Sequence, residues 1–130
     1  RCDRTEEKKM NREILFKAKR IDNGEWVEGQ YAYITNPLTE DGKPIKHLIC
    51  NGTNIFNDLI DPDTLCQYTG LTDKNGKKIW ENDLLGHKLN RVEFLNGTYC
   101  INGDRSLFFE ANTNEVIGNI FDNQEMLEVE

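Results

Sequence analysis

The stretch that decides the fold is Gln67–Asp83, with the sequence QYTGLTDKNGKKIWEND. It holds two apolar runs that are separated by turn-forming residues. We predict that one strand ends near Gly70, that Asp73–Gly76 forms a turn, and that a second strand begins at Ile79. Another tight turn follows at Asn82, because asparagine tolerates the left-handed conformation nearly as well as glycine does. Short strands joined by tight turns indicate a small barrel or a strongly curved sheet.

The dipeptide Asn-Gly recurs along the sequence and supports the same interpretation. A type I′ turn requires positive φ at both central residues, and asparagine followed by glycine meets this requirement at low cost. The runs between these dipeptides are short and rich in β-branched and aromatic residues, as in hairpin strands. We therefore expect type I′ turns at Asn23-Gly24, Asn51-Gly52, Asn75-Gly76, Asn96-Gly97 and Asn102-Gly103.

The clearest hairpin is expected near the N-terminus, where Glu13–Ile21 pairs with Trp26–Ile34. In the first of these strands, side chains alternate between two faces, so that Lys17 and Lys19 lie opposite Phe16. Further strands are predicted at Lys46–Cys50, Thr53–Phe56, Thr64–Thr69, Lys77–Trp80, Leu84–His87, Asn90–Leu95, Thr98–Ile101, Leu107–Ala111 and Val116–Phe121.

The segments between these strands are expected to be loops or single helical turns. Asn36–Pro44 is predicted to be a loop, because its prolines are incompatible with a central strand. Asn57–Pro62 forms either a short helical turn or an irregular link, and Asn123–Leu127 one helical turn. The prediction is an all-β protein with minor helix, made of two small β lobes. Residues 1–9 are a charged N-terminal extension, residues 10–62 the first lobe and residues 63–130 the second.

Charge and hydropathy exclude several classes of protein. The protein has 130 residues with 16 Lys+Arg and 23 Asp+Glu, which gives a formal net charge of -7. Such a surface repels a DNA duplex unless its positive charge is gathered on one face, so non-specific nucleic-acid binding is disfavoured. No apolar run approaches the ~20 residues that span a bilayer, and no secretory signal is evident. We therefore expect a cytoplasmic protein without membrane contact.

The stretch Gln67–Asp83 resembles the signature of YopX-like proteins, a phage and prophage family. Asn82 stands where the family usually has a glycine, which leaves the predicted turn intact. Later in the sequence, Glu115–Asn123, running into Met126–Glu128, is similar to the family's ending.

The resemblance extends to the front of the sequence, where Arg12–Arg20 and Trp26 look like the family's opening strand. It therefore covers nearly everything from Met10 onward. It implies that the C-terminal lobe is an SH3-like barrel and that the protein acts in the cytoplasm of a bacterial host. It leaves the biochemical role undefined.

Metal binding and catalysis each require particular residue types at particular spacings. A zinc site is favoured by close pairs of ligands, and only His47 and Cys50 have such spacing. Free, mostly buried thiols are the better interpretation of the cysteines. Solvated turn carboxylates are likewise a better interpretation of the acidic residues than a magnesium or acid–base site. We expect no metal, no cofactor and no catalytic activity. The residues considered were His47, Cys50, Cys66, Cys100, Asp58, Asp61, Asp63, Glu81 and Asp83.

Binding surfaces are the remaining possibility, and aromatic residues near lysines are the candidates. The first hairpin places Lys17, Lys19 and Arg20 near its aromatic side chains, which suggests a basic and aromatic patch. The alternative is that the aromatic rings fill the core while the lysines form a solvated face. Trp26 and Trp80 each lie next to a turn, where an indole can serve an interface or plug the core. The candidate binding residues are Trp26, Tyr31, Tyr33, Trp80, Lys17 and Lys19.

From these observations we expect a non-catalytic phage or prophage accessory protein. It binds a host or phage protein or a second copy of itself. One alternative is a nucleic-acid-associated regulator that uses the first hairpin. Another is an acidic inhibitor of a host DNA-binding protein, for which the charge of -7 gives some support.

Overall fold

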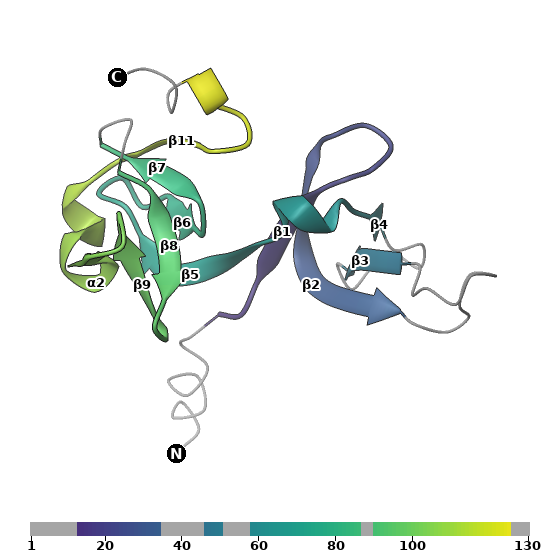
Figure 1. The fold of residues 1–130 in the computed structure, drawn as a ribbon, viewed down its shortest axis with the longest axis horizontal. Coiled ribbons are helices and arrows are strands. Elements are labelled where there is room, and N and C mark those ends of the chain that lie inside the picture. The colour runs from purple at the N-terminus through teal and green to yellow at the C-terminus, as the bar shows by residue number, and fades with distance from the viewer. Residues whose placement is uncertain (1–12, 35–45, 51–57, 87–89, 126–130) are drawn as a thin grey trace, which may run out of the picture. The chain divides into compact units, whose positions relative to one another are not determined.

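The computed structural model of the protein describes residues 13–34, 46–50, 58–86 and 90–125. Within these residues it is an all-β structure with little helix, as the sequence predicts (Figure 1). The protein forms two units, an N-terminal unit over Ile14–Gln67 and a C-terminal unit from Tyr68 onward. Their division falls inside β5 (Cys66–Thr72), a few residues after the position that the sequence suggested.

Four antiparallel strands pair in a ring within the N-terminal unit. β1 pairs with β2, β2 with β3, and β3 with β4. The ring closes because the N–H of Ile21 donates to Leu59 (3.1 Å) and the N–H of Asp61 donates to Lys19 (2.9 Å). The strands are β1 (Phe16–Lys19), β2 (Trp26–Ile34), β3 (Lys46–Cys50) and β4 (Asp58–Leu59).

A small apolar core fills this unit. Ala18, Ile49 and Ile60 are almost completely buried, and partly buried side chains pack around them. These partly buried residues are Phe16, Val27, Tyr31 and Leu65. After β4, the 3-10 helix η1 (Pro62–Thr64) leads into β5, and the threonine hydroxyl at its end accepts a hydrogen bond from the N–H of Lys19 (2.9 Å). η1 therefore fixes the end of β1 against the segment that leaves the unit.

The C-terminal unit consists of short antiparallel strands. β5 pairs with β6, while β11 pairs with β7 and β9 lies between β8 and β10. Hydrogen bonds from Asn82 to Val92 (2.8 Å) and from Leu85 to Asn90 (2.8 Å) join β7 to β8. The strands are β6 (Lys78–Trp80), β7 (Asp83–Leu85), β8 (Val92–Leu95), β9 (Thr98–Ile101), β10 (Arg105–Ser106) and β11 (Val116–Asn119).

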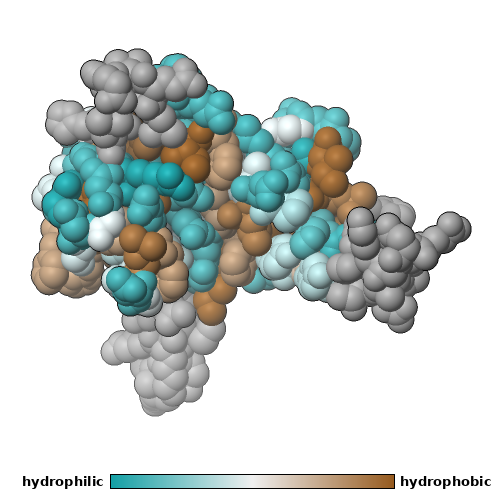
Figure 2. Space-filling view, viewed as in Figure 1, coloured by the Kyte–Doolittle hydropathy of each residue, from teal (hydrophilic) through white to brown (hydrophobic). Residues whose placement is uncertain are grey.

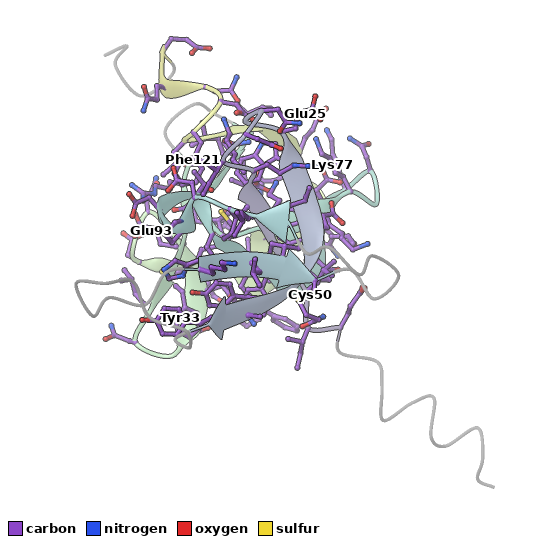
Figure 3. The ribbon with its side chains drawn as sticks, turned by 90° about the vertical axis from the view of Figure 1, so that its right-hand side faces the viewer. Glu25, Tyr33, Cys50, Lys77, Glu93 and Phe121 are labelled. Atoms are coloured by element: carbon purple, nitrogen blue, oxygen red, sulfur yellow. The ribbon has the colours of Figure 1, made fainter. Side chains whose placement is uncertain are left out.

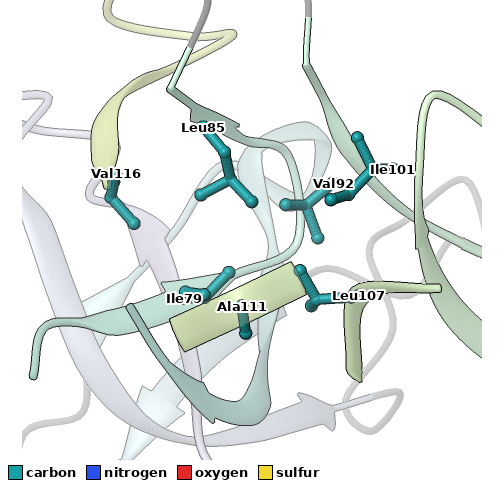
Figure 4. Packing of buried hydrophobic residues seen from close by; sticks show 7 residues of the cluster. All are labelled: Ile79, Leu85, Val92, Ile101, Leu107, Ala111 and Val116. Carbon is teal, nitrogen blue, oxygen red and sulfur yellow. The ribbon is translucent and has the colours of Figure 1, made fainter. Parts of the chain in front are cut away.

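The core of this unit is larger and draws on most of its elements. Strands contribute Leu85, Val92 and Ile101, each at most 1% exposed, and the helical segment contributes Leu107 (Figure 4). Burial of branched apolar side chains from so many short elements holds together strands that would be unstable in isolation. The buried cluster consists of Ile79, Leu85, Val92, Ile101, Leu107, Ala111 and Val116.

The predicted strand over Leu107–Ala111 is wrong. The segment forms the helix α2 (Leu107–Glu110), which continues into the 3-10 helix η2 (Ala111–Thr113). Leu107 and Ala111 are buried, whereas Phe108 and Phe109 are exposed. Positions four residues apart share one face of a helix. Leu107 and Ala111 can therefore both pack into the core from a single helical turn. A strand would instead have buried one phenylalanine.

The Asn-Gly turns are of two kinds, so the expectation of type I′ turns is only half right. At Asn96-Gly97 and Asn102-Gly103 both residues have positive φ, as a type I′ turn requires. At Asn23-Gly24 and Asn75-Gly76 only the glycine has positive φ, with values of 74° and 83°. In these two turns the glycine N–H donates to the backbone carbonyl of a residue before the asparagine, Arg20 or Asp73. The loops are therefore wider than a two-residue type I′ turn. Asn51-Gly52 lies outside the described residues.

Other boundaries agree closely with the pattern. Trp26–Ile34, Lys46–Cys50 and Thr98–Ile101 are strands over the predicted residues. The prediction of a helical turn or an irregular link at Asn57–Pro62 is wrong for Asp58–Leu59, which form the strand β4 because they pair with β3. Pro62 begins η1. Residues 1–9, Asn36–Pro44 and Thr53–Phe56 lie outside the described residues, as does part of Asn123–Leu127.

Candidate binding surfaces

The lysines of β1 gather around Trp26 on one face of the N-terminal hairpin. Lys19 is paired with Trp26 across the two strands. The ammonium groups of Lys17 and Lys19 lie 4.5 Å and 5.4 Å from the centroid of the indole ring. A cation over an indole face is attracted by its quadrupole, which holds these three side chains together. We call Lys17, Lys19 and Trp26 the cationic face.

The two tyrosines of β2 lie on the opposite face of the sheet. Tyr33 is paired with His47 of β3, and their ring centroids are 4.9 Å apart. The hydroxyl of Tyr31 is hydrogen-bonded to Nδ1 of His47 at 2.6 Å. Burial and, to a smaller extent, the neighbouring Tyr33 raise the pKa of Tyr31. Figure 3 shows Tyr33 and Cys50 at opposite ends of the paired strands.

The single basic and aromatic patch that the sequence suggested is therefore divided in two. Successive side chains of a strand point to opposite faces, so Trp26 cannot share a face with Tyr31 and Tyr33. Tyr31 packs against the core of the N-terminal unit, while Tyr33 remains 50% exposed. Only Trp26 lies beside Lys17 and Lys19.

Trp80 does not lie on an open surface. Its side chain is 5% exposed and its ring packs 5.6 Å from that of Tyr68, which is also buried. The sequence allowed this indole to serve either an interface or the core, and in the structure it lies in the core. Its backbone N–H donates to the carboxylate of Asp83 (2.8 Å), which fixes the turn between β6 and β7.

Among the described residues, the most exposed large apolar side chains belong to α2, and the sequence reasoning missed them. Phe108 and Phe109 are 70% and 77% exposed, and their rings lie edge to face at 5.2 Å. In Figure 2, light-brown hydrophobic surface lies where Figure 1 draws α2. The ion pair between Arg105 and Glu110 (2.9 Å) braces the segment that carries them. We call Phe108 and Phe109 the phenylalanine pair.

A signal for the phenylalanine pair was present in the sequence. Leu107 and Ala111 have the spacing of residues on one helical face, and the two phenylalanines stand between them. The segment is too short for periodicity alone to separate a helix from a strand. The two adjacent phenylalanines, which are common in strands, therefore favoured the wrong assignment.

Asp73 organises the motif that characterises the middle of the sequence. Its Oδ1 accepts hydrogen bonds from the N–H groups of Asn75 (2.8 Å) and Lys77 (2.9 Å). Its Oδ2 accepts one from Val116 at the start of β11 (2.9 Å). The residue is 4% exposed; burial by itself raises the pKa of Asp73, but these three N–H groups outweigh it and lower the pKa. The turn before β6 is thereby tied to a strand distant in sequence.

Asn82 completes the motif in the conformation that the sequence predicts. Its φ is 73°, in the left-handed region that asparagine tolerates nearly as well as glycine does. Its side-chain oxygen accepts a hydrogen bond from Arg91 (3.1 Å), which links the turn to the start of β8.

The comparison with protein families agrees with this motif. The model of the family described as YopX protein matches residues 5–128. The chain belongs to the YopX family. The matched range covers both units of this YopX-family protein and the whole of its described structure. No curated protein matches it.

A solved structure has a similar fold. The protein resembles the crystal structure of protein EF1440 from Enterococcus faecalis, with a TM-score of 0.55 and 21% sequence identity. The match covers 88% of the YopX-family protein and 98% of the other chain. At this identity the likeness concerns the fold, and it extends over both units.

Several acidic residues and thiols of this YopX-family protein have structural partners. Asp61 caps η1 by accepting a hydrogen bond from the N–H of Asp63 (3.0 Å), and the thiol of Cys66 donates to the carbonyl of Thr64 (3.3 Å). Cys50, Cys66 and Cys100 are free thiols. Within the described ranges, no group of three or more His, Cys, Asp or Glu is arranged to hold a metal ion. In those same ranges no helix has the length and apolar character to cross a membrane.

Proposed function

We propose that this protein is a non-catalytic accessory protein of phage or prophage origin that binds another protein in the bacterial cytoplasm. The observation that carries the proposal is the phenylalanine pair, two large apolar rings held in solvent on a segment anchored at both ends. Leu107 and Ala111 fix this segment in the core, so the exposure of the rings is built into the fold. Exposed aromatic side chains on a rigid element are typical of interface anchors.

The energy available from the pair is large enough to matter for an interface. Burying a phenylalanine side chain is worth about 1.5–3 kcal/mol, and roughly three quarters of each ring is still accessible. Covering both rings would thus contribute about 3 kcal/mol, which corresponds to a roughly hundredfold gain in affinity. Two serines at these positions would remove that contribution while leaving the core anchors in place.

The first experiment measures self-association and partner capture with matched variants. The full-length protein, the variant Phe108→Ser/Phe109→Ser and the control Ile21→Ser are compared by sedimentation velocity over a wide concentration range. Ile21 is 65% exposed but belongs to the N-terminal unit. A dimer that the double serine variant weakens and the control keeps would support self-assembly.

The same three proteins then serve as bait in nuclease-treated bacterial lysate. A stoichiometric protein retained by the full-length protein and the control, but lost by the double serine variant, would support binding of a different partner. The proposal fails if the double variant behaves like the full-length protein in both experiments. It also fails if the purified protein shows turnover that a point substitution abolishes.

A second candidate function is binding of single-stranded nucleic acid by the cationic face. The observation that favours it is the placement of two ammonium groups against the indole of Trp26, because bases stack on aromatic rings beside positive charge. The net charge of -7 opposes it. Quenching of Trp26 fluorescence by an oligothymidine should appear at low salt, weaken steeply as salt rises, and vanish in Lys17→Gln/Lys19→Gln. Unchanged fluorescence at low salt rejects this function.

We also propose that the C-terminal unit is an SH3-like barrel. The order of pairing β11-β7-β8-β9-β10 and the short helical segment before β11 support this assignment. Small barrels of this class display binding surfaces on the loops and short helices between strands, which is where the phenylalanine pair lies.

A further inference from the structure

Asn-Gly dipeptides are chemically reactive, and the fold places them in unequal environments. The backbone nitrogen of the glycine can attack the amide carbon of the asparagine side chain. A new C–N bond closes a five-membered succinimide ring as the bond from that carbon to the amide nitrogen breaks, and the nitrogen leaves as ammonia. Water then opens the ring to give aspartate or isoaspartate. The reaction needs a glycine N–H that is not engaged in a hydrogen bond and an asparagine side chain that is free to rotate.

Two of the described dipeptides lack an available nucleophile. The N–H of Gly24 donates to the carbonyl of Arg20 and that of Gly76 donates to Asp73, both at 3.0 Å. The side chain of Asn23 is also held, because its oxygen accepts a hydrogen bond from the N–H of Glu25 (3.0 Å). At Asn23-Gly24 and Asn75-Gly76, therefore, at least one bond must open before the ring can close.

A third dipeptide, Asn102-Gly103, has a restrained side chain. The oxygen of Asn102 accepts a hydrogen bond from the backbone N–H of Arg91 (2.9 Å). Its amide nitrogen donates to the side-chain oxygen of Asn90 (3.2 Å). Rotation of this amide toward the glycine nitrogen breaks both bonds, so the reaction is slowed here as well.

Asn96-Gly97 combines none of these restraints. Both residues are exposed at the tip of the β8–β9 hairpin. In the part of the protein that the structure describes, neither the side-chain amide of Asn96 nor the N–H of Gly97 takes part in a hydrogen bond. The next pair along the ladder, Leu95 with Thr98, is also exposed, so the turn can leave its type I′ conformation at low cost.

We propose that Asn96 is a site of spontaneous deamidation, the fastest among the described Asn-Gly dipeptides of the folded protein. Aspartate at this position keeps the turn, because it tolerates positive φ, and adds one negative charge. Isoaspartate instead lengthens the backbone by a methylene group inside a two-residue turn. It thereby disturbs the pairing of Phe94 with Tyr99, whose rings meet edge to face at 4.8 Å just behind the tip.

The test follows deamidation of the folded full-length protein by peptide mapping and mass spectrometry during incubation at mildly alkaline pH. Among the four described dipeptides Asn96 should convert first, and each hydrogen bond at one of the others should slow conversion there by about fivefold. In concentrated urea these differences should disappear, because all the dipeptides are then equally free. Faster or equal conversion of Asn23, Asn75 or Asn102 in the folded protein, or an unmodified Asn96, would overturn the proposal.

The variant Asn90→Ala provides an internal control. It removes one of the two bonds on the Asn102 side chain and should accelerate deamidation of Asn102 by about fivefold, leaving Asn96 unchanged. The variant Asn96→Gly keeps a residue suited to positive φ and should lower the early rate of ammonia release. Early release in Asn96→Gly that is as fast as in the original protein contradicts the assignment.

Discussion

Replacing Asp73 by asparagine tests how the central motif holds the C-terminal unit together. The carboxylate accepts three backbone hydrogen bonds, two at Oδ1 and one from Val116 at Oδ2. In Asp73→Asn, one carboxylate oxygen becomes an NH₂ group, which best replaces Oδ2 and then faces the N–H of Val116. One charge-assisted bond worth about 2 kcal/mol is lost, and a buried donor is left unpaired at a further cost of about 1 kcal/mol. We expect a loss of about 3 kcal/mol in the free energy of unfolding.

Each unit contains one of the two tryptophans, which allows the effect to be assigned. In a Trp26→Phe background, urea unfolding followed by the fluorescence of Trp80 reports the C-terminal unit alone. The control Asp104→Asn changes an exposed carboxylate in the same unit and should shift stability by less than about 0.5 kcal/mol. An Asp73→Asn variant as stable as this control would refute the role assigned to the carboxylate.

The same comparison predicts a pH dependence with a definite sign. The pKa of Asp73 is lowered in the folded state, so its contribution is complete above the unfolded pKa of about 3.9. It is lost as the pH falls through the lower folded pKa. The stability difference between the original protein and Asp73→Asn should therefore shrink below about pH 4 and stay constant between about pH 5 and pH 7. A difference that persists at the most acidic pH at which the unit folds would contradict this linkage.

Three further substitutions test other parts of the fold. Gly29→Ala should lower the free energy of unfolding of the N-terminal unit by about 3 kcal/mol or more, because a Cβ at this position meets the carbonyl of Cys50. Urea unfolding followed by Trp26 fluorescence measures this loss, and an unchanged midpoint would contradict the close approach. Asn82→Ala should cost about 1–2 kcal/mol more than Asn82→Gly by thermal unfolding, because only glycine avoids the strain of positive φ; equal stabilities would be the contrary result. Leu107→Ala should cost about 2–5 kcal/mol and Phe109→Ala less than about 1 kcal/mol in urea unfolding. A strand would place Leu107 and Phe109 on the same buried face, so comparable losses would favour the strand that the sequence suggested.

Local sequence patterns predict secondary structure correctly where the backbone geometry of a short segment determines it. Trp26–Ile34 is predicted to be a strand by its β-branched and aromatic residues, and the structure confirms it. Its register with β1, in which Lys19 pairs with Trp26, differs from the register that a type I′ turn at Asn23-Gly24 would give, because the loop there is wider. The left-handed conformation of Asn82 was expected because few residue types tolerate it. The turn types at Asn-Gly were less predictable. Loop length and the flanking pairs decide whether the asparagine joins the glycine at positive φ.

The candidate surfaces show the limit of such reasoning. Alternation along β2 separates Trp26 from the tyrosines, a consequence that the sequence already contained. The spacing of Leu107 and Ala111 is compatible with a helix, but it does not by itself decide that the phenylalanine pair faces solvent. That outcome depends on Leu107 and Ala111 meeting a core built from distant strands. The same competition for the core decided that Trp80 would be buried although it lies next to a turn.

By itself the sequence determined the all-β class, the family motif and the positions of most strands, because turn chemistry and short-range alternation act within a few residues. Only the tertiary structure decided which strands close the ring in the N-terminal unit, where Ile60 lies beside Arg20. It alone decided that Asp73 reaches Val116, far away in the sequence. The free energy of such contacts arises when apolar groups and N–H donors that are distant in the sequence leave water together. A local sequence pattern does not specify which of these groups come into contact.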